Sequence, residues 1–240
     1  MITDLWLARH GESIGNVAAT TAEIEGLEAI AIEERDADVP LSATGMEQAR
    51  ALGTWLEPHA PAIGAAWVSP YVRARETLAL AIAEAGVGIV PLTDERLRDR
   101  ELGVLDLLTR RGVERLHPGE AERRRRLGKY YHRPPGGESW VDLRLRLRSF
   151  LSDALPTSEG GTLIVAHDAV VMLLISLLTA MSEEELLAFA AANTVLNASV
   201  THLSRDGAQW EVRTFSDVAH LQREGADVTV HPGSPDVEPR

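Results

Sequence analysis

The sequence predicts an α/β protein in three layers (α/β/α), with a mostly parallel central sheet between two layers of helices. Short, continuously apolar segments recur along the chain, as buried parallel strands do. The stretches between several of them have the apolar periodicity of helices. The chain has 240 residues, of which 45% are hydrophobic, so its apolar content is sufficient for a complete core.

Strands are expected where apolar runs are bounded by turn residues. Parallel, buried strands are predicted at residues 5–8, 65–68, 89–92 and 162–166. Two more, at 198–203 and 210–215, are separated by Arg205-Asp206-Gly207, which favours a hairpin turn.

Helices are expected at residues 46–56, 71–85, 138–155, 169–179 and 186–191. Thr44 with Glu47, and Ser182 with Glu185, have the spacing of a capping box at a helix N-terminus. The most hydrophobic region, 162–181, is interrupted by polar residues at 167 and 168. It therefore predicts a buried strand, a polar turn and a buried helix, and no membrane span.

The chain is expected to form a single domain over residues 1–222. Two segments without a predicted strand, near 14–40 and 105–137, are interpreted as insertions, the first with one helix around 21–32. From residue 223 to 240 the chain is rich in Pro, Gly, Asp and Val, which is typical of a flexible tail.

Composition narrows the range of functions. The chain has no cysteine, which excludes disulfides and thiolate metal sites and favours the reducing cytoplasm; we expect no signal peptide. The net charge of −12 argues against nucleic acid as a partner. Any phosphate site must then be a local positive pocket within an acidic surface.

Arg9-His10-Gly11 directly follows the first predicted strand. In open α/β sheets, ligands bind outside the carboxyl ends of the strands. A guanidinium can hold phosphoryl oxygens while an imidazole attacks the phosphorus. A surface Arg-His pair at a strand end explains this short match equally well.

His167 has the same placement after the predicted strand at 162–166. A lone histidine there is more often structural, but adjacent central strands would bring His10 and His167 face to face. The helix after His167 would aim its N-terminal N–H groups at the same place, which favours an anion. Arg73 lies in the first turn of a predicted helix, where the dipole disfavours a cation and suggests another task. Both Arg73 and Arg75 are also compatible with solvated helix arginines, Arg75 more so.

Six short motifs follow one another along the chain. They are Arg9-His10-Gly11-Glu12-Ser13 with Asn16, Pro40-Leu41-Ser42 with Gly45, Ser69-Pro70 with Arg73, Ala74 and Thr77, Leu97-Arg98-Asp99 with Gly103, Pro135-Gly136-Gly137-Glu138-Ser139, and Ala166-His167. In this order they resemble the histidine phosphatase superfamily, the phosphoglycerate-mutase-like group, over roughly residues 4–215. Each motif is weak alone, but the ordered series is specific.

The resemblance implies a phosphoglycerate-mutase-like fold and catalysis through a phosphohistidine at His10. It also implies a phosphate pocket formed by His10 with Arg9, Arg73 and His167, and lined by Ser13 and Asn16. No metal or cofactor is expected, because the arginines would neutralise the phosphate and repel a cation.

The proton donor of the family often lies in a Leu-x-Glu-x-x-x-Gly pattern. Here Asp99 occupies the glutamate position of that pattern, one methylene shorter. Glu101 is a rival if the loop is shifted, and Asp168 is another, because acid phosphatases of the superfamily use a His-Asp pair. We rank Asp99 first, Asp168 second and Glu101 third.

The later half resembles the fructose-2,6-bisphosphatase type. Gly137-Glu138-Ser139-Trp140 with Asp142, and His167-Asp168-Ala169-Val170, match its pattern. Trp140 replaces an expected tyrosine and Asp168 an expected glutamine, at positions that lie near the sugar phosphate in that family. We therefore expect both residues beside the substrate, while the identity of the substrate does not carry over.

These observations predict a metal-independent phosphomonoesterase that acts on a small phosphorylated metabolite. A phosphoglycerate-type mutase and a non-catalytic phosphate-binding protein are the alternatives, and the oligomeric state stays open, with a homodimer among the options. The run Arg123-Arg124-Arg125-Arg126 is interpreted as a helix face paired with Glu120 and Glu122, although guidance of acidic substrates is a second interpretation. Lys129 and Arg133 are better placed to contact a second substrate charge.

Overall fold

The computed structural model describes residues 3–157, 160–207 and 209–231. Within these ranges the strands form one sheet with the order β3-β2-β4-β1-β5-β6. They are β1 (Asp4–Arg9), β2 (Ile63–Val68), β3 (Leu92–Thr93), β4 (Gly161–Ala166), β5 (Val200–Asp206) and β6 (Gln209–Asp217). β3, β2, β4 and β1 are parallel, and β5 and β6 complete the sheet in antiparallel pairing.

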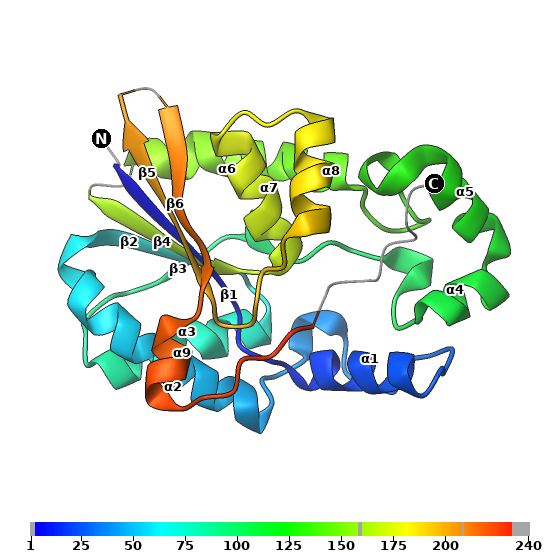
Figure 1. The fold of residues 1–240 in the computed structure, drawn as a ribbon, viewed down its shortest axis with the longest axis horizontal. Helices are drawn as coiled ribbons and strands as arrows, with labels where there is room; N and C mark the ends of the chain where they lie inside the picture. The colour runs from blue at the N-terminus through cyan, green and yellow to red at the C-terminus, as the bar shows by residue number, and fades with distance from the viewer. Residues whose placement is uncertain (1–2, 158–159, 208, 232–240) are drawn as a thin grey trace.

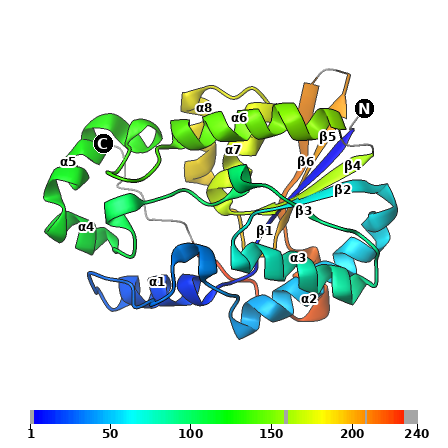
Figure 2. The same cartoon turned by 180° about the vertical axis from the view of Figure 1, so that it is seen from behind.

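Helices cover both faces of this sheet (Figures 1 and 2). One layer contains α2 (Ala43–His59), α3 (Val72–Ala85) and α9 (Ala219–Glu224), and the other contains α6 (Trp140–Thr157), α7 (Asp168–Leu178) and α8 (Glu183–Ala192). Successive residues of β1 point to opposite layers, as the pleat of a strand requires. Leu5 and Leu7 join the core under α6 and α7, whereas Trp6 and Ala8 join the core under α2 and α3. The predicted three-layer α/β fold is therefore confirmed.

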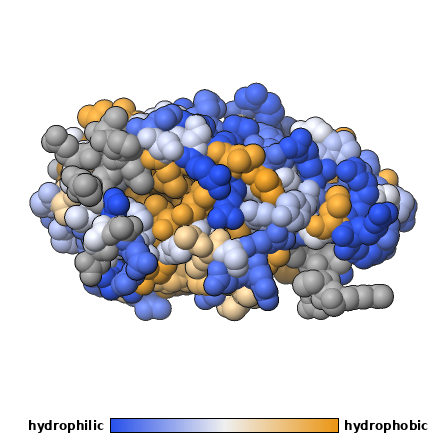
Figure 3. Space-filling model, turned by 90° about the horizontal axis from the view of Figure 1, so that it is seen from above, coloured by the Kyte–Doolittle hydropathy of each residue, from blue (hydrophilic) through white to orange (hydrophobic). Residues whose placement is uncertain are grey.

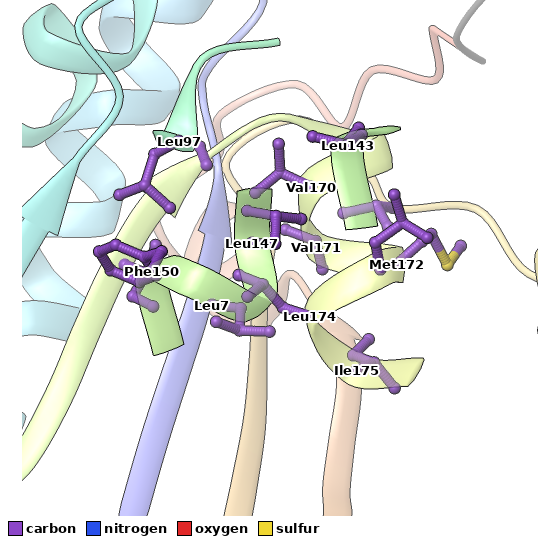
Figure 4. Close-up of a cluster of buried hydrophobic side chains, with 14 of the residues drawn as sticks. Leu7, Leu97, Leu143, Leu147, Phe150, Val170, Val171, Met172, Leu174 and Ile175 are labelled. Carbon is purple, nitrogen blue, oxygen red and sulfur yellow. The ribbon is translucent and has the colours of Figure 1, made fainter. Parts of the chain in front are cut away.

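The larger core lies between the sheet, α6 and α7 (Figure 4). On α6, Leu143, Leu147 and Phe150 recur at the spacing of one helix face and are fully buried. α7 is buried over most of its length, which explains its unbroken apolar sequence. Among the described residues, no helix is both long and apolar enough to cross a membrane. On the face drawn in Figure 3, apolar residues reach the surface between hydrophilic ones, as is normal for globular proteins.

Two local predictions need correction. β3 covers only Leu92–Thr93, not residues 89–92, since Pro91 has no N–H for a sheet ladder and Val90 is 82% exposed. α2 begins at Ala43, because Ser42 rather than Thr44 caps it and accepts the N–H of Gly45. The capping box of Ser182 with Glu185 is present at the start of α8.

The two insertions fold against each other beyond the carboxyl end of β1 (Figure 1). The first forms α1 (Ile14–Ile24), earlier than the predicted 21–32, because Ser13 and Asn16 make a capping box there. The second forms α4 (Arg110–Leu116) and α5 (Pro118–Tyr131). Ala29 bridges Leu108, and the Ile30 N–H donates to the Leu107 carbonyl at 2.8 Å.

Part of the segment predicted as a flexible tail has a defined place. Residues 223 and 224 end α9, and residues 225–231 then run back toward the end of β1. The Gln48 amide donates to the carbonyl of Asp227 at 2.8 Å and to the hydroxyl of Thr229 at 2.9 Å. Residues 232–240 of the predicted tail lie outside the described residues.

Candidate active site

The sheet order brings the two histidines together. β1 and β4 are neighbours with Arg9 opposite Ala166, so the residues that follow, His10 and His167, leave the sheet side by side. The His10 N–H donates to the Ala166 carbonyl at 2.9 Å. The two rings meet edge to face, with centroids 5.1 Å apart.

The His10 imidazole is held in one tautomer. Its Nδ1 lies 2.7 Å from the Gly11 carbonyl oxygen, and because a carbonyl only accepts, Nδ1 carries the proton. Nε2 is then the nitrogen with a free lone pair. Burial, followed by the charge of Arg73, holds the pKa of His10 well below its ordinary value. The ring is therefore neutral, as a nucleophile must be.

Close backbone packing fixes the loop that carries His10. A Cβ atom on Gly45 would lie 1.9 Å from the Glu12 carbonyl oxygen, so only glycine allows α2 to approach this loop. The Ser42 N–H donates to the same carbonyl at 2.9 Å. On the other side, the Gly11 N–H donates to the Thr77 hydroxyl at 3.0 Å. The glycines of the first two motifs thus serve the placement of one side chain.

His167 is fully buried beside His10. Its Nε2 lies 2.8 Å from the Ser69 hydroxyl, and its Nδ1 lies 3.4 Å from Asp99 Oδ2 without a hydrogen bond to any described residue. Burial first, then Arg73 and Arg9, lower the pKa of His167 well below its ordinary value. With the Ser69 hydroxyl donating to Nε2, Nδ1 carries the proton and can donate it to a ligand oxygen.

Two buried guanidiniums complete the cluster. Arg9 donates through Nη1 to the Val195 carbonyl at 2.6 Å and through Nη2 to the His231 carbonyl at 2.9 Å. Its Nε is buried without a hydrogen-bond partner among the described residues. Arg73 donates to the Asp36 carbonyl at 2.5 Å and pairs with Asp99 at 3.2 Å.

Electrostatics distinguish the two arginines. Burial lowers the pKa of Arg9, although Asp168 and Asp99 oppose the shift. Burial acts in the same direction on Arg73, but the adjacent carboxylates, Asp36 above all, outweigh it and raise its pKa. Both side chains therefore stay cationic, so the site holds two buried positive charges in a protein of net charge −12.

A cavity of about 340 Å³ opens beside these groups. The predicted site residues that line it are Arg9, His10, Ser13, Asn16, Arg73, Asp99, Glu101, Trp140 and Asp168. His167 adjoins it through its ring contact with His10. The structure therefore brings all ten predicted site residues to one place, from β1 and the loop after it, α1, α3, the loop of residues 98–102, the start of α6, and the β4–α7 junction.

The three carboxyls considered as proton donors differ in their contacts. Asp99 is the one that touches both Arg73 and His167, and its side chain is 24% exposed. Asp168 accepts the N–H of Ala169 at 2.7 Å in the first turn of α7. Glu101 accepts the Tyr71 hydroxyl at 3.1 Å and is 48% exposed. Of these three carboxyls, Asp99 is therefore the one with ion-pair contacts to the cluster among the described residues.

Sequence reasoning missed several contributors. Ser69 belongs to the third motif without an assigned role, although it follows β2 as His10 follows β1, so the strand-end rule could have placed it in the site. Asn197 donates to the His10 carbonyl and to Asn16 Oδ1, both at 3.2 Å. Asp36, on a short 3-10 turn, reaches Arg73, and His231 reaches Arg9. No local pattern marks Asn197, Asp36 or His231.

The basic residues of the second insertion separate into two groups. On the exposed face of α5, Arg123 pairs with Glu120 and Arg125 with Glu122, as the solvated-face interpretation predicts. Lys129 lines the cavity, with its ammonium 4.3 Å from the centre of the Trp140 ring. Arg133 pairs instead with Asp142, Nε to Oδ2 at 2.6 Å, and does not line the cavity. On α3, Arg75 is exposed.

The molecule is thus a three-layer α/β protein with two buried histidines at neighbouring strand ends and two buried arginines facing them. The family model of the histidine phosphatase superfamily, branch 1, matches residues 5–218. The chain belongs to this superfamily.

Similar proteins carry both phosphatase and mutase names. A protein of Serratia proteamaculans named probable phosphoglycerate mutase GpmB is 32% identical, with 93% of this chain and 97% of that protein covered. A putative alpha-ribazole-5'-P phosphatase of Escherichia coli K-12 has a TM-score of 0.73 at 22% identity, covering 90% of this chain and 97% of that one. A mycobacterial glucosyl-3-phosphoglycerate phosphatase has a TM-score of 0.72 at 24% identity, covering 90% and 100%. The two solved structures share the fold, and the specific activity of this chain is a separate question.

Proposed function

We propose that this protein is a metal-independent phosphomonoesterase that acts on a small phosphorylated metabolite through a phosphohistidine on His10. One observation carries the proposal. Arg9 Nε and, in the tautomer that accepts from Ser69, His167 Nδ1 are buried N–H donors without a hydrogen-bond partner among the described residues. The charge of Arg9 and the ring of His167 both act on the neutral His10. Leaving such a donor unpaired costs about 1–3 kcal/mol. Two of them beside a nucleophile suit the oxygens of a phosphoryl group.

The first step transfers the phosphoryl group to the protein. The Nε2 lone pair of His10 attacks phosphorus while the ester oxygen leaves in line, and the arginines and His167 hold the equatorial oxygens. Asp99 donates its proton to the departing alkoxide, so an alcohol is released. General acid help of this kind is worth about a hundred- to ten-thousandfold in rate.

The second step regenerates the enzyme. Asp99, now a carboxylate, accepts a proton from water as the water oxygen attacks phosphorus. The phosphorus–nitrogen bond breaks, inorganic phosphate leaves, and His10 returns to its neutral form. Asp99 serves as acid and then as base, and its contacts with Arg73 and His167 place its carboxyl beside the reacting groups.

The mutase alternative is motivated by the names of the sequence relatives. A mutase would return the phosphoryl group from His10 to a bound product, with no net release of phosphate. A non-catalytic phosphate-binding protein would form no phosphohistidine. A cytoplasmic location stays a prediction from the cysteine-free composition.

Incubation with 4-nitrophenyl phosphate separates these functions. We expect steady release of inorganic phosphate and an acid-labile phosphate on His10, detected by mass spectrometry after a rapid alkaline quench. His10→Ala should abolish both, whereas His117→Ala, on the second insertion, should change neither. Isomerisation of 3-phosphoglycerate without net phosphate release would instead establish the mutase, and no phosphohistidine with any ester would refute both enzymes.

The proton donor has its own test. Asp99→Asn should slow an alkyl phosphate, whose alkoxide is a poor leaving group, by at least about a hundredfold. An aryl phosphate should slow by less than about tenfold, because a phenolate leaves with little help. Asp168→Asn and Glu101→Gln are the matched controls. If either of them gives the large alkyl-selective loss, the assignment of Asp99 is wrong.

A further inference from the structure

The cavity extends beyond the phosphate cluster into an apolar wall. Its apolar lining includes Ile30, Ile32, Leu107, Leu108, Met172 and Ala190. The first four are half-buried and belong to none of the core clusters among the described residues. Apolar side chains that face a cavity and are not used by the core are available to a ligand.

The two insertions build this wall jointly. Thr109 Oγ1 donates to the Leu27 carbonyl at 2.6 Å, next to the Ile30–Leu107 hydrogen bond. Leu107 has a φ of +56°, a left-handed conformation that leucine rarely adopts. Its N–H donates to the side chain of Asp106 at 3.0 Å. Backbone strain of this kind gathers at ligand sites, where the surrounding structure holds a residue in position.

The charges around the wall disfavour a second anion on the substrate. Asp36 and Asp99 are already paired with Arg73. Apart from these groups and Arg9, the described lining contributes two cations, Arg100 and Lys129, and three carboxyls, Glu101, Asp106 and Asp168. Asp106 directly precedes Leu107, and its charge contributes to raising the pKa of Asp36, so both carboxyls act near the wall. A carboxylate or second phosphate carried along this wall would meet like charge.

We infer that the substrate is a phosphate monoester of an alcohol with an apolar body and no second anionic group. The inference rests on the proposed phosphatase function and names its substrate class. The phosphoryl group lies against His10 and the arginines, and the alcohol body lies against Ile30, Ile32 and the two leucines. Such a site selects against phosphoglycerate, whose carboxylate meets three carboxyls, Glu101, Asp106 and Asp168, against two remaining cations.

Three alkyl esters with the same kind of leaving group test this directly: ethyl phosphate, hexyl phosphate and 6-(phosphonooxy)hexanoate. Hexyl phosphate should exceed ethyl phosphate in kcat/KM by at least about tenfold, because its longer chain buries more apolar surface. It should exceed the carboxylate ester by at least about tenfold, because the terminal charge is repelled. Equal or better turnover of the carboxylate ester, or no gain from ethyl to hexyl, would overturn the inference.

Matched variants locate the effect. Ile32→Ala should lower the hexyl-to-ethyl ratio about three- to tenfold. Ile24→Ala, in the same insertion but 81% exposed, should leave the ratio as it is. Asp106→Asn should lower the discrimination against the carboxylate ester, whereas Glu114→Gln, on α4 outside the cavity lining, should not. If the controls shift the ratios as much as Ile32→Ala and Asp106→Asn do, the wall does not set specificity.

Failure of this inference is distinguishable from failure of the proposed function. If 4-nitrophenyl phosphate phosphorylates His10 while the carboxylate ester is preferred, the phosphatase stands and the substrate class is wrong. If no ester phosphorylates His10, the function itself is wrong.

Discussion

At the scale of single residues, Asp36 has the most direct bearing on phosphate binding. Its carboxylate lies 2.9 Å from Arg73 Nη1, and its carbonyl accepts from the same guanidinium. Burial raises its pKa, with Asp99 and Asp106 adding to the shift and Arg73 opposing it. A phosphoryl oxygen that binds Arg73 must share or replace this contact, so Asp36 competes with the substrate.

Asp36→Asn should therefore strengthen inhibition by inorganic phosphate. We expect the inhibition constant at pH 8 to fall about three- to tenfold, the effect of one partly screened charge pair. Because the pKa of Asp36 is raised, the wild-type carboxyl becomes neutral at a higher pH than an ordinary aspartate. The inhibition constants of variant and wild type for inorganic phosphate should therefore become more similar as the pH is lowered. Both are measured with 4-nitrophenyl phosphate as the substrate.

Asp38→Asn is the control, because Asp38 pairs with the exposed Arg35 and does not line the cavity. Weaker phosphate inhibition in Asp36→Asn, or an equal strengthening of phosphate inhibition in Asp38→Asn, would show that Asp36 does not compete with phosphate for Arg73.

Which residues could be predicted depends on how their position is encoded. His10 and His167 follow apolar strands directly, so their place at the sheet edge is a local property of the sequence. Arg73 could be singled out because a cation in the first turn of a helix is locally unfavourable. Asp36 and Asn197 act through loops whose paths are set by distant contacts. Neither could be found without those paths.

At the scale of elements, the segment of residues 225–231 acts as a strap across the site. The His231 carbonyl accepts from Arg9, and the His231 ring lies 2.8 Å from Glu12 and 2.6 Å from Thr20 Oγ1. Glu12 in turn accepts the Ser42 hydroxyl at 2.6 Å. The strap therefore joins β1, α1 and α2 around a guanidinium that binds phosphate in the proposed mechanism.

Removal of this strap should impair catalysis more than folding. A chain that ends at Gly225 lacks the His231 carbonyl, so the Arg9 guanidinium should lose one of the two backbone carbonyls that hold it in place. We expect kcat/KM for 4-nitrophenyl phosphate to fall at least about tenfold, the size of effect that misplacing a catalytic group can have. A chain that ends at Ser234 keeps the contacts of residues 225–231 with the other described residues and should retain its activity.

Circular dichroism of both chains would show whether the fold is kept. If the two truncated chains have the same activity, the strap does not position Arg9.

The helices that pack on the sheet could be predicted because burial leaves a periodic apolar pattern in their sequences. The insertions and the strap could not, because they leave no such pattern. α3, α6 and α7 bury one face or nearly all of their surface, so burial imposes a periodic apolar pattern. The strap is held by hydrogen bonds from Gln48 and Arg9, partly to backbone carbonyls, which leave no such pattern. α1 begins where its capping box lies, and the predicted helix missed that signal at Ser13 and Asn16.

At the scale of the whole molecule, the strand order is what creates the site. β1 and β4 are far apart in sequence but adjacent in the sheet, and β2 on the other side of β4 supplies Ser69. Alternating strands and helices predict a parallel sheet, but they do not state which strands are neighbours. The ordered motifs supplied that adjacency through the family resemblance. The cavity wall is built from loop-to-loop contacts of two insertions. Neither the strand–helix pattern nor the ordered motifs predicted it.

The buried histidines make the stability of the whole molecule sensitive to acid. Burial is the first cause that lowers the pKa of His10, His167 and His220 in the folded protein, and arginines add to the effect at the first two. In the unfolded chain these rings return to a pKa near 6.5. Above that pH neither state binds the proton, and the histidines contribute their full stability. As the pH falls below it, the unfolded state alone takes up protons, and stability is lost until the folded pKa values are reached.

For His10 and His167 together, the free energy of unfolding should fall by about 2–3 kcal/mol between pH 7.5 and pH 5.5. Urea unfolding followed by tryptophan fluorescence at each pH would measure it. His167→Asn removes one buried imidazole and should reduce the loss by about 1–1.5 kcal/mol, even if the variant is less stable at pH 7.5. His117→Asn, outside the cluster, should keep the whole loss. A free energy of unfolding that is flat or rising toward pH 5.5 would mean that the two rings already carry protons in the folded state, and then His10 is not the neutral nucleophile that phosphoryl transfer requires.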